Sequence, residues 1–233
     1  MEAMAGPLFG VLLGMRHACE PDHLAAISTL VAREDGERAR PGLLLGVFWG
    51  FGHTAALLAV AVALTVLQAR LPARLADAFE LGVALMLLAL GARALRRAVA
   101  TGGEGPRRLH VHGSERHEHG AGNGHVHLGR WTLAVRPLAV GVVHGLAGSG
   151  ALTALVFASL PGTHARLAYI ALFGLGSVAG MALLSGAAGW PLARLGRRPA
   201  AARALSAATG LFSIGFGLFW GWSSLWRCLE IFT

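Results

Sequence analysis

Two histidines and an aspartate, His17, Asp22 and His23, lie close together near the N-terminus. Two imidazoles and a carboxylate suit a divalent transition metal such as nickel, cobalt, zinc or copper. In an unbroken helix His17 and His23 would point about 240° apart, so the three side chains could not meet. Pro21 removes a backbone donor between them and predicts a break that lets them converge. We therefore expect a metal site here; the alternative is that these residues only pair with one another across a helix bundle.

The three residues lie in an apolar run, residues 7–31, which is long enough to cross a bilayer. A charged side chain at mid-membrane depth costs roughly 2.5–3.5 kcal/mol on insertion scales, and such residues usually face a bundle interior or a wet cavity. The run therefore predicts a functional site. Arg16 and Glu20 stand one helical turn apart and are expected to pair. Glu20 is also a candidate for metal binding or proton coupling.

Two further histidines lie within later apolar runs, His53 in residues 42–68 and His144 in residues 132–159. Gly50 and Gly52 precede His53 and would let another helix approach closely. We expect His53 to complete the metal site, because its depth matches that of the first two histidines. For His144 a ligand role and a hydrogen bond across the bundle both remain open. Ser149, Thr153 and Ser177 are expected to serve in packing or helix–helix hydrogen bonds.

Composition indicates an integral membrane protein. Hydrophobic residues make up 55% of the 233 residues, above the 45–50% typical of soluble domains. The backbone in lipid must satisfy its own hydrogen bonds, which predicts an all-α fold. The apolar runs predict six transmembrane helices, at residues 7–31, 42–68, 77–99, 132–159, 166–190 and 202–226. The net charge of +8 does not indicate a nucleic-acid partner, because the basic residues lie in short loops.

The two halves of the chain resemble each other. GMRHACEPDHLAAI parallels GVVHGLAGSGALTAL, which aligns His17 with His144, and FWGFGHTAALL parallels LFGLGSVAGMALL, which aligns His53 with Ser177. Three spans per copy is an odd number, so the second copy would be inverted in the membrane, as in many transporters. We predict two inverted three-helix repeats, residues 1–99 and 131–233, with a broken first helix.

The segment between the halves, residues 100–130, is rich in histidine and glycine. Histidine-rich tracts bind metal ions weakly without a packed core, and the glycines oppose a fixed structure. We expect a disordered tether that captures metal with low affinity, through His110, His112, His117, His119, His125 and His127.

Arginine is distributed unevenly between the predicted loops. Fifteen arginines lie in or beside the loops on one side, which include residues 100–130, and four lie on the other side. Positive loops face the cytoplasm. This predicts a multi-pass protein of a bacterial cytoplasmic (inner) membrane, with the histidine-rich loop cytoplasmic and both termini extracytoplasmic.

The spacing of His17, Asp22 and His23 resembles the H-x4-D-H signature of the nickel/cobalt transporter family. His53-Thr54 is similar to a second motif of that family, G-H-[ST], and the segment 173–177 to a third, L-F-x-L-G-[FS]. His144, in HGLAGSG, is similar to the urease-associated and efflux branches. The resemblance implies transport of Ni²⁺ or Co²⁺ as substrate, with no prosthetic group. It also implies a metallochaperone or a urease or hydrogenase maturation protein as a cytoplasmic partner; import and export both remain open.

A membrane metalloenzyme or redox protein is the alternative function, with the same histidines holding zinc or haem. The sequence contains no H-E-x-x-H, C-x-x-C or C-x-x-C-H motif, the short patterns typical of zinc proteases, thiol redox sites and attached haem. We therefore expect a transporter and not an enzyme.

Overall fold

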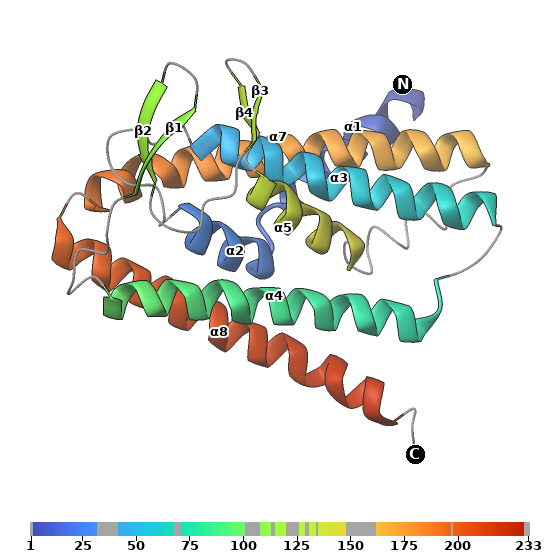
Figure 1. Ribbon diagram of the computed structural model, residues 1–233. Coiled ribbons are helices and arrows are strands. Elements are labelled where there is room, and N and C mark those ends of the chain that lie inside the picture. Colours follow the sequence, from blue (N-terminus) through green and yellow to red (C-terminus); the bar gives the residue numbers. More distant parts are fainter. Residues whose placement is uncertain are drawn as a thin grey trace.

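The computed structural model describes residues 2–31, 42–67, 71–100, 108–112, 115–119, 126–128, 131–133, 135–147, 162–196 and 198–230. Within these ranges the chain forms helices and two short β-hairpins (Figure 1). The helices are α1 (Glu2–His17), α2 (Pro21–Val31), α3 (Gly42–Val66), α4 (Ala73–Ala100), α5 (Val135–Leu146), α7 (Thr163–Gly196) and α8 (Pro199–Glu230).

Four of these helices are long and apolar enough to cross a membrane, over Gly42–Leu64, Ala73–Val99, Thr163–Gly189 and Ala200–Cys228. The chain is therefore a membrane protein with a helical core. The expected first span is divided between α1 and α2, and α5 covers only the beginning of the expected fourth span. The rest of that span, including Ser149 and Thr153, lies outside the described residues. The count of six spans therefore stays a prediction.

The predicted break in the first apolar run is confirmed. Helix α1 ends at His17 and α2 begins at Pro21. The amide of Cys19 donates to the Arg16 carbonyl at 2.9 Å, and the amide of Glu20 donates to the His17 carbonyl at 3.0 Å. These short-range bonds close the end of α1. Pro21 suits the first position of α2, because the amide that it lacks would have no partner within the helix.

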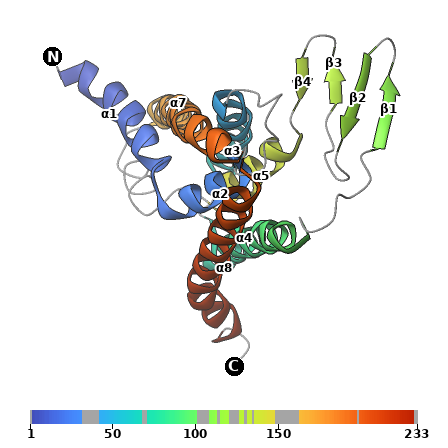
Figure 2. The ribbon, with the colours of Figure 1, turned by 90° about the vertical axis from the view of Figure 1, so that its left-hand side faces the viewer.

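The helices lie in layers. Figures 1 and 2 show the short helices α2 and α5 between the pair α3–α7 and the pair α4–α8. Helix α2 packs into this space with small and larger apolar residues on its inner side. Ala25 and Ala26 are completely buried, and Leu30 is almost so, in a core cluster with Trp49 of α3 and Leu87 of α4.

Glycines bring helix backbones into direct contact at several places. A Cβ atom on Gly14 of α1 would collide with the carbonyl oxygen of Phe173 in α7. A Cβ atom on Gly141 of α5 would likewise collide with the carbonyl oxygen of Trp49 in α3. Close helix approach at small residues is the usual way in which membrane helices associate.

These contacts match between the two halves of the chain. In the alignment of the halves Gly14 corresponds to Gly141, and Trp49 to Phe173. A second pair of contacts follows the same rule, because a Cβ atom on Gly52 would meet the Leu138 carbonyl and one on Gly176 would meet the Val11 carbonyl. Each first helix therefore packs on the second helix of the other half through equivalent positions.

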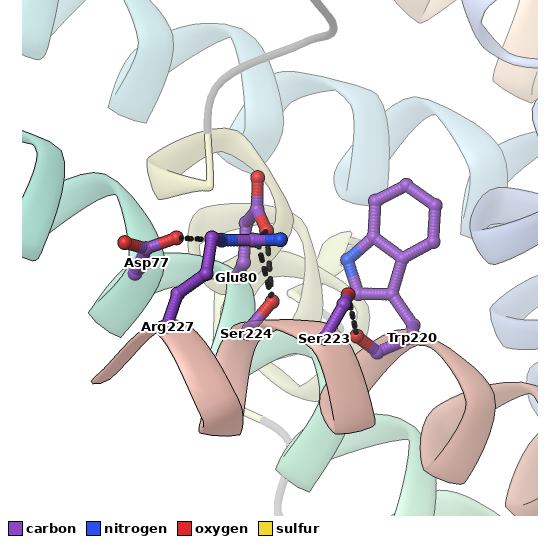
Figure 3. A network of polar contacts seen from close by, with 6 residues as sticks. All are labelled: Asp77, Glu80, Trp220, Ser223, Ser224 and Arg227. Atoms are coloured by element: carbon purple, nitrogen blue, oxygen red, sulfur yellow. Dashed lines mark hydrogen bonds and ion pairs between the residues drawn. The ribbon is translucent and has the colours of Figure 1, made fainter. Parts of the chain in front are cut away.

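A polar network joins α4 to the end of α8 (Figure 3). Arg227 donates to Asp77 at 2.7 Å and to Glu80 at 2.7 Å, and the Ser224 hydroxyl donates to Glu80 at 2.8 Å. The Arg227 side chain is about half exposed, and exposed ion pairs contribute only about 0.2–1 kcal/mol. The network therefore helps to set the register of α4 and α8, while the buried contacts along the two helices supply most of their stability.

The segment expected to lack fixed structure contains two antiparallel hairpins. Strand β1 (Arg108–His112) pairs with β2 (Glu115–His119), and β3 (Val126–Leu128) pairs with β4 (Trp131–Leu133). Figure 2 shows both hairpins beyond the edge of the helices. In β1 and β3 the difference from our expectation has a local cause, because His alternates there with Leu or Val, which is the two-residue period of a strand. The glycines of this segment lie outside the strands.

Candidate metal site

The break between α1 and α2 brings the signature residues together. His17 ends α1, while Asp22 and His23 lie in the first turn of α2. Residue His53 of α3 and His144 near the end of α5 meet them. The four histidines are buried, with 5%, 1%, 0% and 3% of the residue surface exposed in chain order. All five predicted core residues thus gather at one place.

The predicted loop histidines lie elsewhere. Within the described residues His110, His112, His117, His119 and His127 belong to strands β1, β2 and β3, which Figure 2 shows apart from the helical core. Residue His125 lies outside the described residues.

Three imidazoles form the centre of the site. The ring centroids of His17 and His23 are 4.4 Å apart, and each ring lies close to that of His53, at 5.1 and 5.4 Å respectively. One nitrogen of each ring lies within 4.8 Å of the others. The ring of His23 is inclined by 69° to that of His17 and by 75° to that of His53. Imidazoles that approach from different directions can direct their lone pairs at one ion, and three histidines are a recurring set of ligands for divalent transition metals.

Several nitrogens of these rings have no hydrogen-bond partner within the described part of the chain. They are Nε2 of His17, Nε2 of His23 and both nitrogens of His53, all of them buried, and both nitrogens of the neighbouring His144 are likewise unpaired. A buried polar atom without a partner costs about 1–3 kcal/mol, and most such atoms in proteins are paired. A bound cation would accept the lone pairs of these nitrogens. The unpaired atoms therefore mark the position where an ion fits.

The carboxylate of Asp22 lies close to two imidazoles, those of His23 and His144. Asp22 Oδ1 lies 3.0 Å from His23 Nδ1, and Asp22 Oδ2 lies 3.5 Å from His144 Nε2. Asp22, His23 and His144 thus form a second group with ligand atoms within 4.8 Å of one another.

Glu20 contacts a different residue from the one we expected. Its Oε2 lies 2.9 Å from Nδ1 of His17, whereas we expected a pair with Arg16. The reason is the break before Pro21, which ends α1 and turns the side chain of Glu20 back over the last residue of that helix.

Aromatic side chains close the site. The Trp49 ring lies 5.4 Å from that of His23 and 5.8 Å from that of His144, and the Phe173 ring lies 5.4 Å from that of His17. Both aromatic residues are buried, so they keep water from this part of the cluster. Sequence reasoning missed them, although each stands one helical turn before an aligned residue, His53 or Ser177.

Two neighbouring hydroxyl residues lie at helix contacts. Ser177 occupies the position equivalent to His53 and is completely buried, as expected for a packing residue, although its hydroxyl makes no hydrogen bond within the described residues. Thr54, which follows His53, donates to the Gly174 carbonyl of α7 at 3.1 Å. The second family motif therefore supplies both a site histidine and a bond between helices.

Comparison with known proteins identifies the family. No protein-family profile and no solved structure matches the chain. The chain is 30% identical over 209 residues to the urease accessory protein UreH from Bacillus sp. (strain TB-90), over 90% of its own length and 87% of that protein. The alignment spans nearly the whole of both chains, and the H-x4-D-H signature lies in the buried cluster. The chain therefore belongs to the family of urease accessory protein UreH, within the nickel/cobalt transporter family.

Proposed function

We propose that the protein carries a divalent transition-metal ion across a bacterial cytoplasmic membrane, with Ni²⁺ as the preferred substrate and Co²⁺ as the next. The observation that supports this most directly is the buried group of unpaired imidazole nitrogens at the break between α1 and α2. Ionisable residues at such a break in a membrane protein are typical of transport sites. The relation to a urease accessory protein favours nickel, because urease is a nickel enzyme.

The chemistry of the cluster restricts the ion. Imidazole suits nickel, cobalt, zinc and copper, whereas magnesium and calcium prefer sites made of oxygen atoms. The ion would exchange part of its hydration shell for the nitrogens of His17, His23 and His53, with Asp22 and His144 beside them. A neutral imidazole and a nearby carboxylate let the ion enter the apolar core without an isolated charge.

The transport mechanism follows from the proposed architecture. We infer two inverted repeats, residues 1–99 and 131–233, which together supply six spans. The matched glycine contacts between α1 and α7 and between α5 and α3 support this repeat. Rocking of one repeat against the other would expose the ion to each side in turn. The arginine asymmetry supports a cytoplasmic segment 100–130, where a metallochaperone or a urease or hydrogenase maturation protein would exchange the ion.

Reconstituted vesicles test this function. Purified protein in vesicles that contain a metal-sensitive dye should take up Ni²⁺ or Co²⁺ down a concentration gradient, whereas protein-free vesicles should not. The variant His164→Ala is a matched control, because His164 is an exposed histidine at the start of α7, outside the cluster. It should transport at the parental rate.

The same purified protein also distinguishes a transporter from the alternative, a membrane metalloenzyme or redox protein. A membrane redox protein with haem would show intense visible absorption, and a zinc enzyme would keep stoichiometric zinc after purification. Absence of flux together with either result would replace the transporter assignment with that of a metalloprotein.

The histidine-rich segment should affect affinity more than maximal rate. We expect deletion of residues 109–127 to raise the metal concentration that gives half-maximal flux several-fold and to leave the rate at saturating metal nearly unchanged. The buried histidines lie on packed helices, while the described strands of this segment lie apart from the helices (Figure 2). We therefore expect the segment only to raise the local ion concentration. Flux measured against metal concentration checks this. Complete loss of flux at saturating metal, with normal membrane abundance, would place the segment within the transport path.

A further inference from the structure

We infer that the ion is held by the three imidazoles of His17, His23 and His53, while Asp22 and Glu20 act as positioning residues that orient two of those rings. This inference rests on the proposed function and assigns a role to each residue of its site. It also places His144 beside Asp22, outside the set of three imidazoles that hold the ion.

The first step concerns the two nitrogens of each ring. His17 directs Nδ1 at Glu20 at 2.9 Å, and His23 directs Nδ1 at Asp22 at 3.0 Å. In both rings Nε2 is the buried nitrogen without a hydrogen-bond partner among the described residues. A neutral imidazole has one donor and one acceptor nitrogen. A carboxylate that accepts from Nδ1–H therefore leaves Nε2 with a free lone pair, which is the form that binds a metal.

The second step concerns the other oxygen of Asp22. It lies 3.5 Å from His144 Nε2, so each oxygen of this carboxylate faces one imidazole. The rings of His23 and His144 are stacked, with centroids 4.5 Å apart and planes inclined by only 30°. The nitrogens of His144 make no hydrogen bond within the described residues, so Asp22 and His144 are close neighbours at this distance. The ligand atoms of His144 group with those of Asp22 and His23, whereas those of His17 group with His23 and His53.

The third step compares the two carboxylates. The side chain of Asp22 is 16% exposed and that of Glu20 is 45% exposed. A hydrogen bond in water contributes less than one shielded from it. Asp22 should therefore orient its imidazole more firmly than Glu20 does. Removal of a carboxylate that supports a metal-binding histidine typically weakens metal affinity 10–100-fold.

The experiment measures binding and coordination, not flux. Purified parent, Asp22→Asn, Glu20→Gln, His144→Gln and His53→Ala proteins are titrated with Co²⁺, and the Ni²⁺ complexes are examined by X-ray absorption. We expect Asp22→Asn to bind about 10–100-fold more weakly and Glu20→Gln less than 10-fold more weakly. Both, and His144→Gln, should keep the parental number of imidazole ligands. His53→Ala should lose one.

The outcomes separate the roles. Loss of an oxygen ligand in Asp22→Asn, or of an imidazole in His144→Gln, would overturn the positioning role even where the parent binds and transports normally. If Asp22→Asn fails to fold, Glu20→Gln still tests the positioning role, because it should weaken binding without the loss of an imidazole ligand. Failure of the parent to bind either ion would overturn the proposed function itself. Binding with the expected pattern, but without flux in vesicles, would leave the division of roles intact.

Discussion

Replacement of His23 by alanine should abolish metal transport while the protein still inserts into the membrane. His23 is the residue that both candidate groups share, and its ring lies within 5.4 Å of the rings of His17 and His53 and within 4.5 Å of that of His144. Its loss would leave too few nitrogens to replace the hydration shell of the ion and would remove the main partner of Asp22. We expect flux below about 1% of the parental value, since loss of an outer-shell partner alone costs 10–100-fold.

The measurement is uptake of radioactive nickel by cells with matched membrane abundance of each protein. His23→Ala also leaves a buried cavity, so His23→Gln, which fills more of the space, serves as a second variant. His164→Ala controls for the loss of any histidine, because this residue is exposed on α7. Parental uptake by His23→Ala at normal abundance would show that the signature does not hold the ion.

The break in the first apolar run was predictable because its cause is local. Proline lacks an amide donor, and this holds whatever surrounds it. The helix therefore ends just before Pro21, and His17 and His23 meet as the sequence indicated. The presence of His53 in the histidine cluster was equally predictable, because the depth of a residue in a membrane helix follows from its distance along the apolar run.

The division of the cluster into two groups was not predictable. It depends on how far α3 and α5 are rotated about their axes, and an apolar run carries little information on that angle when both faces are apolar. Backbone contacts at Gly141 and Gly52 set the rotation. The positions of Trp49 and Phe173 beside the histidines depend on the same helix packing. The pairing of Glu20 with His17 depends on the path of the chain between the two helices.

Addition of one methyl group at Gly141 should damage the protein far more than the same change at Gly82. A Cβ atom on Gly141 would overlap the Trp49 carbonyl oxygen and lie 2.9 Å from the His53 amide nitrogen. These are backbone atoms, which cannot move aside by a change of rotamer, so α5 would have to separate from α3 and carry His144 away from the site. Overpacking of this kind costs roughly 1–3 kcal/mol or more.

Gly82→Ala is the matched control, because no atom lies within 4 Å of a Cβ added there. Alanine favours a helix over glycine by about 1 kcal/mol, so this variant should be as stable as the parent or slightly more so. We expect Gly141→Ala to lower the apparent melting temperature in detergent by roughly 5 °C or more and to weaken Co²⁺ binding. Equal melting temperatures for the two variants would contradict the close contact of α5 with α3.

Gly14→Ala extends the same test to the proposed repeat. Its added Cβ would overlap the Phe173 carbonyl oxygen and lie 2.8 Å from the Ser177 amide nitrogen, the counterparts of the two atoms that face Gly141. If the halves are related by inversion, Gly14→Ala should destabilise the protein about as much as Gly141→Ala, because the two backbone contacts are equivalent. It should also displace His17, which ends the same helix, and so weaken metal binding. A protein that tolerates Gly14→Ala but not Gly141→Ala would have halves that pack differently, and the proposed rocking of two equivalent repeats would lose its structural basis.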